Sequence, residues 1–346
     1  MNHRARSQRE DSGRYGPGDL TVPVQTESGV RQRRQLEVGI VGLGRWGWNY
    51  AQVLARIPSC RVEAMADTNP AALSPNSEIR SCRQSRQVRL YTGLEPLLED
   101  RLVGAIVIAT PDYTHFDLAS RCLEAGLDVL VEKPMCHTVS QARRLVALAA
   151  ARGRILAVSH TALYQPQFTV LVSALTQGSL GRPLRVESVR TSTGPAERER
   201  ADVLFDLGPH DIAMVVSLFG LPVASRALDS GPNCAEFELL FVDEVRARCR
   251  VAWQRQRIRR FALTGTLGTH TIVEQQSPAP ADQPLFRQCC DFVTCCLMRT
   301  APQSNDRLGL NVIRCLESVA CSRREAGRWV SLDELPAAHE AYAGMQ

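Results

Sequence analysis

The chain has 346 residues, of which 44% are apolar, and its 41 basic and 36 acidic residues give a formal net charge of +5. This length predicts two domains with ample apolar material for buried cores. The charges are mixed along the chain, which argues against a nucleic-acid-binding protein. The lack of any apolar run of roughly 18 residues argues against a membrane span.

Residues 1–35 are basic and lack a hydrophobic pattern, so we expect a disordered extension. The extension also lacks the apolar segment of a secretory signal, which predicts a cytoplasmic protein. Twelve cysteines are present, but no two have the Cys-x-x-Cys spacing of metal sites and redox motifs. We therefore expect reduced thiols and no metal site.

Residues 36–160 alternate short apolar runs with helical patterns such as that of residues 140–153. This alternation predicts strand-helix-strand units and a doubly wound parallel sheet of the Rossmann type. The predicted strands lie at residues 36–41, 61–66, 104–110, 128–133 and 155–160.

The pattern changes after residue 160. A helical stretch at residues 166–178 is followed by strand patterns with short connections, and helices return at residues 285–324, interrupted at residues 300–307. Consecutive strands without intervening helices predict an antiparallel sheet. The sequence therefore predicts an α/β dinucleotide-binding domain at residues 36–160 and an α+β domain with an open, mostly antiparallel sheet at residues 161–346.

The first predicted strand ends in a glycine-rich loop, GLGRWG, and a helical pattern follows. In such a connection Gly42 permits a tight turn and Gly44 lets the backbone approach a pyrophosphate, which the helix N-terminus favours. Asp67 ends the second strand about 20 residues after Gly47, where a carboxylate can accept hydrogen bonds from ribose hydroxyls. We favour dinucleotide binding, with NAD preferred to NADP, over a simple tight turn and helix cap.

Two charged residues, Glu132 and Lys133, stand before Pro134 at the end of a later strand. Ligands of parallel sheets bind at the carboxyl ends of the strands. Lys133 would therefore reach the nicotinamide end of the cofactor, where an ammonium can polarise a reacting oxygen. Pro134 fixes the backbone direction, and its peptide bond can be cis. The alternative is a salt bridge beside an ordinary turn.

A second motif, DLGPHD, contains an acid and a histidine near a helix start, which we place at Gly208-Pro209. Asp206 and His210 are four residues apart and can face the same side. Histidine can take a hydroxyl proton while hydride leaves, and a carboxylate can orient it. Capping or a satisfied buried position is the alternative for His210, but with Lys133 the pair would complete an alcohol-oxidising site, which we favour.

Four motifs together resemble the Gfo/Idh/MocA oxidoreductase family: GLGRWG, ATPDYTH (residues 109–115), VEKPM and DLGPHD. The resemblance spans residues 36–331 and implies an NAD(P)-dependent interconversion of a secondary alcohol and a ketone on a sugar. In that family the second domain also makes subunit contacts, which implies a homo-oligomer, either a dimer or a tetramer. No nucleic-acid or membrane partner is expected.

The resemblance implies that Lys133 polarises the reacting oxygen, that His210 relays the hydroxyl proton, and that Asp206 orients His210. NAD is the expected cofactor, and NADP stays open. The residues assigned to the cofactor are Gly42, Gly44, Arg45, Trp46, Gly47, Asp67, Thr110, Pro111, His115, Glu132 and Lys133. The residues assigned to the substrate are Lys133, Tyr164, Arg200, Asp206 and His210.

The continuation of the glycine loop through Asn49, the segment HTALYQP at residues 160–166 and DLGPHD are similar to the branch that acts on nucleotide sugars. We expect such a substrate first, although Tyr164 in this segment is equally explained as a packing residue. The alternatives are an inositol or free-sugar dehydrogenase, a keto-sugar reductase, and a catalytically silent nicotinamide-binding regulator.

The chain departs from the family pattern at Ala213, where many relatives carry an acid, so one polar contact is missing or is supplied by Asp211. Arg198 and Arg200 precede the DLGPHD motif and could clamp a carboxylate or a diphosphate. Solvated loop charges are the simpler interpretation of these arginines. We expect Trp253 to be a packing residue.

Overall fold

The computed structural model describes residues 35–73, 88–194, 201–273 and 283–333. Residues 1–34, which make up nearly all of the predicted extension, lie outside the described residues. Arg198 and Arg200 also lie outside them.

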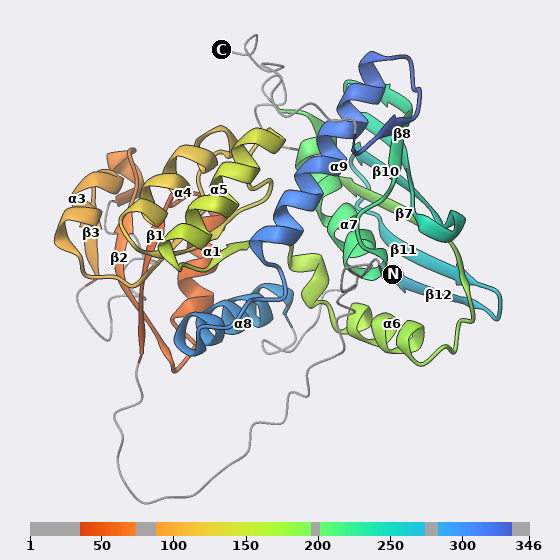
Figure 1. Ribbon diagram of the computed structural model, residues 1–346. Helices are drawn as coiled ribbons and strands as arrows, with labels where there is room; N and C mark the ends of the chain where they lie inside the picture. Colours follow the sequence, from red (N-terminus) through yellow and green to blue (C-terminus); the bar gives the residue numbers. More distant parts are fainter. Residues whose placement is uncertain (1–34, 74–87, 195–200, 274–282, 334–346) are drawn as a thin grey trace, which may run out of the picture. The chain divides into compact units, whose positions relative to one another are not determined.

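The first sheet has six parallel strands (Figure 1). In sheet order they are β3 (Arg89–Tyr91), β2 (Cys60–Ala66), β1 (Leu36–Val41), β4 (Ala105–Ile108), β5 (Asp128–Val131) and β6 (Leu156–Val158). The order reverses between β1 and β4, and such a switch point offers a ligand crevice at the carboxyl ends of the strands. The predicted Rossmann-type sheet is confirmed.

Helices cover both faces of this sheet, which explains why β4 and β5 are buried along their whole length. One face packs against α3 (Leu94–Asp100), α4 (His115–Glu124) and α5 (Val139–Arg152). The other face packs against α1 (Arg45–Leu54) and α8 (Pro284–Met298). Alternation along β4 serves both cores, because Ile106 and Ile108 face the first group of helices and Val107 faces the second.

The second sheet has seven strands and is mostly antiparallel, as predicted. In sheet order they are β12 (Thr269–Val273), β11 (Arg259–Gly265), β7 (Pro183–Ser192), β10 (Arg246–Trp253), β9 (Cys234–Leu240), β8 (Ala224–Gly231) and β13 (Val330–Ser331). Strands β7 and β10 pair in parallel, and the other described pairs are antiparallel.

One face of the second sheet packs against α7 (Val203–Phe219) and α9 (Asp306–Arg324). Along β10, Cys249 and Val251 are buried in this core, whereas Arg248 and Arg250 between and beside them stay exposed. The remaining helices are α6 (Pro166–Thr176) and the 3-10 helices η1 (Pro70–Leu73), η2 (Asp112–Thr114), η3 (Thr161–Tyr164) and η5 (Val242–Glu244). No helix in the described part of the chain is both long and apolar enough to cross a membrane.

The C-terminal helix α8 belongs to the core of the first sheet, although the sequence places it in the second domain. Phe292 and Val293 of α8 pack with the β1 and α1 residues of that core, and Figure 1 shows α8 beside α1. After α8 the chain lies along the edge strand β6, where the carbonyl oxygen of Ser304 accepts a hydrogen bond from the Val158 amide. Residues 33–346 therefore form one unit by their contacts, and a domain boundary at residue 160 stays a prediction.

We predict that Phe292→Ala destabilises the protein by about 3–5 kcal/mol, because the side chain is 1% exposed in the first-sheet core and its loss leaves a cavity. Urea unfolding measures the change. The control is Met298→Ala at the end of the same helix, because the Met298 side chain is 69% exposed. This substitution should cost no more than about 0.5 kcal/mol. Equal small effects would mean that α8 does not belong to this core.

Candidate active site

The glycine loop after β1 has two glycines required by packing and one that is open. Gly42 has φ 90°, and a Cβ there would lie 2.8 Å from the backbone of Ala109. A Cβ on Gly47 would lie 1.9 Å from the Gly42 carbonyl oxygen, so only glycine lets α1 start this close to β1. A Cβ on Gly44 would meet nothing within 4 Å. This open space at the N-terminus of α1 fits the predicted approach of a pyrophosphate.

Asp67 follows β2 and binds the glycine loop directly. Its Oδ2 accepts the Leu43 amide at 2.6 Å, and its Oδ1 accepts the Asn69 amide at 2.8 Å. Each carboxylate oxygen keeps a further lone pair for a ribose hydroxyl. The ribose contact stays a prediction, but the structure shows that Asp67 also holds the shape of the loop.

The loop after β4 is held by His115, which is 1% exposed. Its Nδ1 lies 2.8 Å from the Pro134 carbonyl oxygen, and its Nε2 lies 2.9 Å from that of Thr110. Burial lowers the pKa of His115, although the two carbonyl oxygens oppose this effect. Both ring nitrogens therefore face main-chain oxygens of the two neighbouring loops. His115 supports the predicted cofactor site, and a direct contact with the cofactor stays a prediction.

Thr110 and Pro111 form the start of the same loop, between β4 and η2. The Thr110 and Thr114 hydroxyls are 2.7 Å apart, and the Thr114 hydroxyl donates to the Pro111 carbonyl oxygen at 2.7 Å. This loop lies beside Gly42 at the carboxyl ends of β4 and β1. A Cβ added to Gly42 would lie 2.8 Å from the Thr110 methyl group. Arg45 and Trp46 lie exposed at the start of α1, and the guanidinium carbon lies 5.9 Å from the indole centroid.

Glu132, at the end of β5, is buried and linked to α1. Its Oε1 lies 2.7 Å from the Tyr50 hydroxyl, and its Oε2 accepts the Lys133 amide at 3.2 Å. The Tyr50 hydroxyl also lies 2.7 Å from Oγ of Ser159, after β6. This network connects the helix of the glycine loop with the ends of two neighbouring strands. Sequence reasoning missed Tyr50 because a tyrosine within a helix gives no motif.

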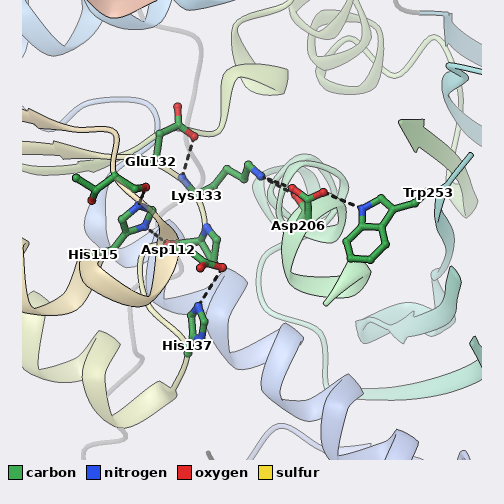
Figure 2. A network of polar contacts seen from close by, with 9 residues as sticks. Asp112, His115, Glu132, Lys133, His137, Asp206 and Trp253 are labelled. Atoms are coloured by element: carbon green, nitrogen blue, oxygen red, sulfur yellow. Dashed lines mark hydrogen bonds and ion pairs between the residues drawn. The ribbon is translucent and has the colours of Figure 1, made fainter. Parts of the chain in front are cut away.

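Lys133 reaches from the first sheet to the first turn of α7 (Figure 2). Its ammonium donates to the Asp206 carbonyl oxygen at 2.7 Å and lies 3.0 Å from Oδ1 of the same residue. The Lys133–Pro134 peptide bond is cis. The lysine and the acid that the sequence predicted for one site therefore meet.

The role that we predicted for Asp206 is wrong in one respect, because Asp206 does not orient His210. Its Oδ1 faces Lys133, and its Oδ2 accepts a hydrogen bond from Trp253 Nε1 at 2.9 Å (Figure 2). Residues four apart share a helix face, but the short aspartate side chain bends toward the stronger donors beside it. Trp253, expected only to pack, is thus a hydrogen-bond donor to the site.

The helix that carries these residues begins earlier than predicted. Asp202 caps α7 by accepting the Leu204 amide at 2.8 Å, so the helix starts at Val203 and not at Gly208-Pro209. Pro209 lies inside the helix, where it removes one backbone hydrogen bond. An aspartate is a strong N-cap and supplies a start signal upstream of the proline.

His210 is half-buried on α7, and its Nδ1 is buried with no partner among the described residues. Burial lowers the pKa of His210 well below 6.5, and the positive charges of Arg190, Lys133 and Arg259 lower it further. The imidazole is therefore neutral near pH 7 and can accept a proton.

Asp211 does not replace the acid that is missing at residue 213. It points to the second sheet, where Arg190 Nε lies 2.5 Å from its Oδ2 and the Ser188 hydroxyl donates to its Oδ1 at 2.6 Å. Ala213 is fully buried in the core. Neither Ala213 nor Asp211 therefore supplies a carboxylate to the site beside Lys133.

Tyr164 is 7% exposed, and its hydroxyl is occupied within the protein. It donates to Asp291 at 2.7 Å and accepts the Ser304 amide at 3.2 Å. These contacts join η3 to α8 and support the packing interpretation. A contact of Tyr164 with substrate stays a prediction, and Arg200 lies outside the described residues.

One sequence signal for this site was overlooked. Lys133 is the only lysine in the chain, and every other residue among the 41 basic ones is arginine. Ammonium and guanidinium differ in shape and donor geometry. A chain that uses arginine everywhere else but keeps lysine here indicates a need for a compact ammonium. In the described ranges no cluster of His, Cys, Asp and Glu is arranged to hold a metal ion.

Comparison with known proteins agrees with this geometry. Residues 36–160 match the GFO_IDH_MocA family model, described as an oxidoreductase family with an NAD-binding Rossmann fold. Residues 36–160 of the chain belong to the Gfo/Idh/MocA oxidoreductase family by this match.

Two curated relatives share part of this chain. The uncharacterised oxidoreductase YdgJ of Escherichia coli K12 is 33% identical over 198 residues, which are 55% of each chain. The UDP-N-acetylglucosamine 3-dehydrogenase of Acidithiobacillus ferrooxidans is 28% identical over 194 residues, which are 56% of this chain and 58% of that protein. The chain thus spans about half the length of the curated relatives that it matches.

The fold likeness extends further. The solved structure of scyllo-inositol dehydrogenase from Lactobacillus casei, with bound NAD(H) and scyllo-inositol, matches with a TM-score of 0.76. The match covers 87% of this chain and all of the other chain, at 15% identity. At this identity the likeness shows the fold of both sheets and nothing about the substrate.

We predict that Gly44→Ala weakens NADH binding by about tenfold or more while the protein stays folded. The new Cβ meets no protein atom within 4 Å, but it projects where the pyrophosphate approaches the backbone. Fluorescence titration with NADH and a melting curve measure the two effects. Gly153→Ala is not a suitable control because φ is 59° there, whereas Gly268→Ala, also without a neighbour within 4 Å, should leave binding unchanged. Unaltered affinity in Gly44→Ala would contradict the cofactor site.

Proposed function

We propose that this protein is an NAD-dependent oxidoreductase that interconverts a secondary alcohol and a ketone on a sugar or cyclitol ring. The observation that carries this proposal is the contact of the chain's only lysine with Asp206, one helical turn before His210, beyond the carboxyl edge of the parallel sheet. A catalytically silent regulator would have no need to keep this set of side chains together.

The residues around the glycine loop fit a dinucleotide. Gly44 leaves open space at the N-terminus of α1, and Asp67 places a carboxylate beside the loop. A carboxylate there favours NAD over NADP, because it would repel a ribose 2′-phosphate. When bound, NAD accepts the hydride from the alcohol carbon or returns it from NADH.

Lys133 would stabilise negative charge on the reacting oxygen. An ammonium has three N–H donors, and the contacts with Asp206 use two of them. The third is left for the hydroxyl or carbonyl oxygen of the substrate. Asp206, itself held by Trp253, fixes the direction of the ammonium and balances its charge.

His210 would accept the proton. In the oxidation, Nε2 of His210 would take the O–H proton while the alcohol carbon loses its hydride, which bound NAD would accept, and becomes a ketone. The lowered pKa of His210, caused by burial and by nearby cations, keeps Nε2 available as a base near pH 7. The reduction uses the same groups in the opposite direction.

Within this class, a nucleotide sugar is the first substrate to test, and inositol is the second. The 28% identical UDP-N-acetylglucosamine dehydrogenase favours the first, and the fold shared with a scyllo-inositol dehydrogenase allows the second. The segment of residues 160–166, which suggested nucleotide sugars, is mostly buried and supports the core. It therefore lends the nucleotide sugar less support than the sequence alone suggested.

The predicted homo-oligomer and the cytoplasmic location are part of this proposal. The outer face of the second sheet carries exposed Arg246, Arg248 and Arg250 beside Glu236 and Glu238. Such rows of opposite charge can pair across a two-fold axis.

The proposal is tested by nicotinamide absorbance with NAD and NADP, in both directions, on nucleotide sugars, uronates, inositols and free sugars. We expect turnover on one class. Lys133→Ala and Lys133→Arg should both lose about 10²–10³-fold in kcat, since arginine keeps the charge but not the compact ammonium. Both variants should bind NADH within a few-fold of wild type.

Arg152→Ala removes one positive charge from the exposed last turn of α5 and is the matched control. It should leave turnover unchanged. Equal activity of Lys133→Arg and wild type would contradict the role of the ammonium. No turnover by wild type on any class would contradict the enzymatic proposal.

The pH dependence follows from His210. Because burial and cations lower its pKa well below 6.5, the base form persists in acid. We predict that kcat/KM for alcohol oxidation stays level as the pH falls through 6.5 and declines only below it. Arg259→Gln removes one of these cations, so the pKa rises and the acid limb moves to higher pH. A wild-type limb above pH 6.5 would argue against this account.

A further inference from the structure

Two imidazole nitrogens near Lys133 have no partner among the described residues. They are Nδ1 of His210 and Nε2 of His160, and both atoms are buried. A buried polar atom without a partner costs about 1–3 kcal/mol. Two such atoms near the same ammonium therefore need an explanation.

His160 stands beside Lys133 at the carboxyl edge of the first sheet. Val158 of β6 is in register with Val131 of β5, and the Ser159 amide donates to the Val131 carbonyl oxygen. Lys133 follows the end of β5 by two residues, and His160 follows the end of β6 by two residues, so both stand just beyond the carboxyl ends of neighbouring strands. Sequence reasoning quoted the segment that begins with His160 but gave this residue no role.

The segment after His160 leads to the helix of His210. The 3-10 helix η3 begins at Thr161 and packs against α7. Lys133 contacts Asp206, one turn before His210 on the same helix. His160 thus lies next to the lysine on one side and adjoins a segment in contact with α7 on the other.

The second ring nitrogen of His160, Nδ1, has a hydrogen-bond partner. It lies 2.9 Å from Oγ of Ser304. The Ser304 backbone is itself fixed, because its carbonyl oxygen accepts the Val158 amide and its amide donates to Tyr164. Only Nε2 of this buried ring is left for another group.

We propose that His160 orients His210, through a hydrogen bond from Nδ1 of His210 to Nε2 of His160 that forms in the working enzyme. This inference rests on the proposed function, in which His210 accepts the hydroxyl proton at Nε2. A neutral histidine with a lone pair at Nε2 carries its hydrogen on Nδ1 and needs an acceptor there. His160 supplies that acceptor when its own hydrogen lies on Nδ1, toward Ser304. His160 is then a positioning residue in the place that the sequence gave to Asp206.

The protonation states are consistent with this pairing. Burial, and to a smaller extent the charge of Lys133, lower the pKa of His160 to about 3. His160 is therefore neutral and keeps a lone pair at neutral pH. Once His210 has taken the substrate proton, its Nδ1–H becomes a charge-assisted donor, and such hydrogen bonds are stronger than neutral ones. The proton stays on His210 until the product leaves, and His160 holds the ring in place throughout.

Two substitutions at residue 160 separate the two sides of the ring. Asparagine places its amide where Nδ1 lies, so His160→Asn keeps a group for Ser304 and removes the one for His210. Glutamine places its amide where Nε2 lies, so His160→Gln does the opposite. We expect His160→Asn to lose about tenfold or more in kcat, part of the 10²–10⁴-fold that a general base contributes, with KM for NAD unchanged. His160→Gln should recover most of this loss.

His270→Asn, on the edge strand β12, is the matched control and should change neither constant. If His160 serves only the packing around Ser304, His160→Gln will be the more damaged variant. That result would overturn the proposal.

A spectroscopic readout does not depend on turnover. In a ¹⁵N-histidine spectrum of the full chain, with the His210 signals assigned by their loss in His210→Gln, we expect His210 to carry its hydrogen on Nδ1. His160→Asn should shift this tautomer balance toward Nε2–H, and His160→Gln should restore it. An Nε2–H tautomer in wild type, or no change in His160→Asn, overturns the pairing. Wild-type spectra as expected without turnover on any substrate would instead mean that the proposed function fails and the pairing stands.

Discussion

The contact between Lys133 and Asp206 is the interaction on which the rest of the site depends. It joins the end of β5 in the parallel sheet to the first turn of α7, which packs on the second sheet. The two side chains are 16% and 28% exposed, so the pair is partly shielded from water and is stronger than a surface ion pair. It also remains accessible enough for a substrate oxygen to join it. The other carboxylate oxygen accepts a hydrogen bond from Trp253. Only one oxygen therefore faces Lys133, which balances the charge of the ammonium and leaves one N–H group free for a substrate.

Burial, with a smaller contribution from the charge of this lysine, lowers the pKa values of two neighbouring histidines. The pKa values of both nearby imidazoles, the buried His160 and the half-buried His210, are lowered first by burial and then by positive charges, including that of Lys133. Two neutral histidines beside an ammonium make a site that can accept one proton and hold negative charge on an oxygen at the same time. Tyr50 on α1 hydrogen-bonds to Glu132, and Glu132 accepts the backbone amide of Lys133. The helix that follows the glycine loop therefore helps to position Lys133.

The connection between the two sheets also depends on packing. Helix α8 follows the strands of the second sheet in sequence but packs in the core of the first sheet. The residues after α8 lie along β6. Ser304 in this segment contacts His160 and Tyr164. The segment after α8 therefore supports the edge of the first sheet where the proposed site lies. A hinge between two independent halves would not explain these contacts, which hold residues 33–346 in one unit.

The sequence by itself determined the parallel sheet and its glycine loop, because both depend on local pattern. It also put forward Lys133, Asp206 and His210 as site residues, from the rule that ligands bind at strand ends, and their roles stay predictions. Its strand-only patterns also predicted the mostly antiparallel second sheet. Only the tertiary structure decided which of these side chains are partners. The four-residue spacing paired Asp206 with His210, but Lys133 and Trp253 come from distant parts of the chain and bind both carboxylate oxygens. The helix start moved to Val203 because Asp202 provides a better cap. His160 has no motif that marks it, and its place depends on β5 and β6 being neighbours in the sheet, which a single sequence does not specify.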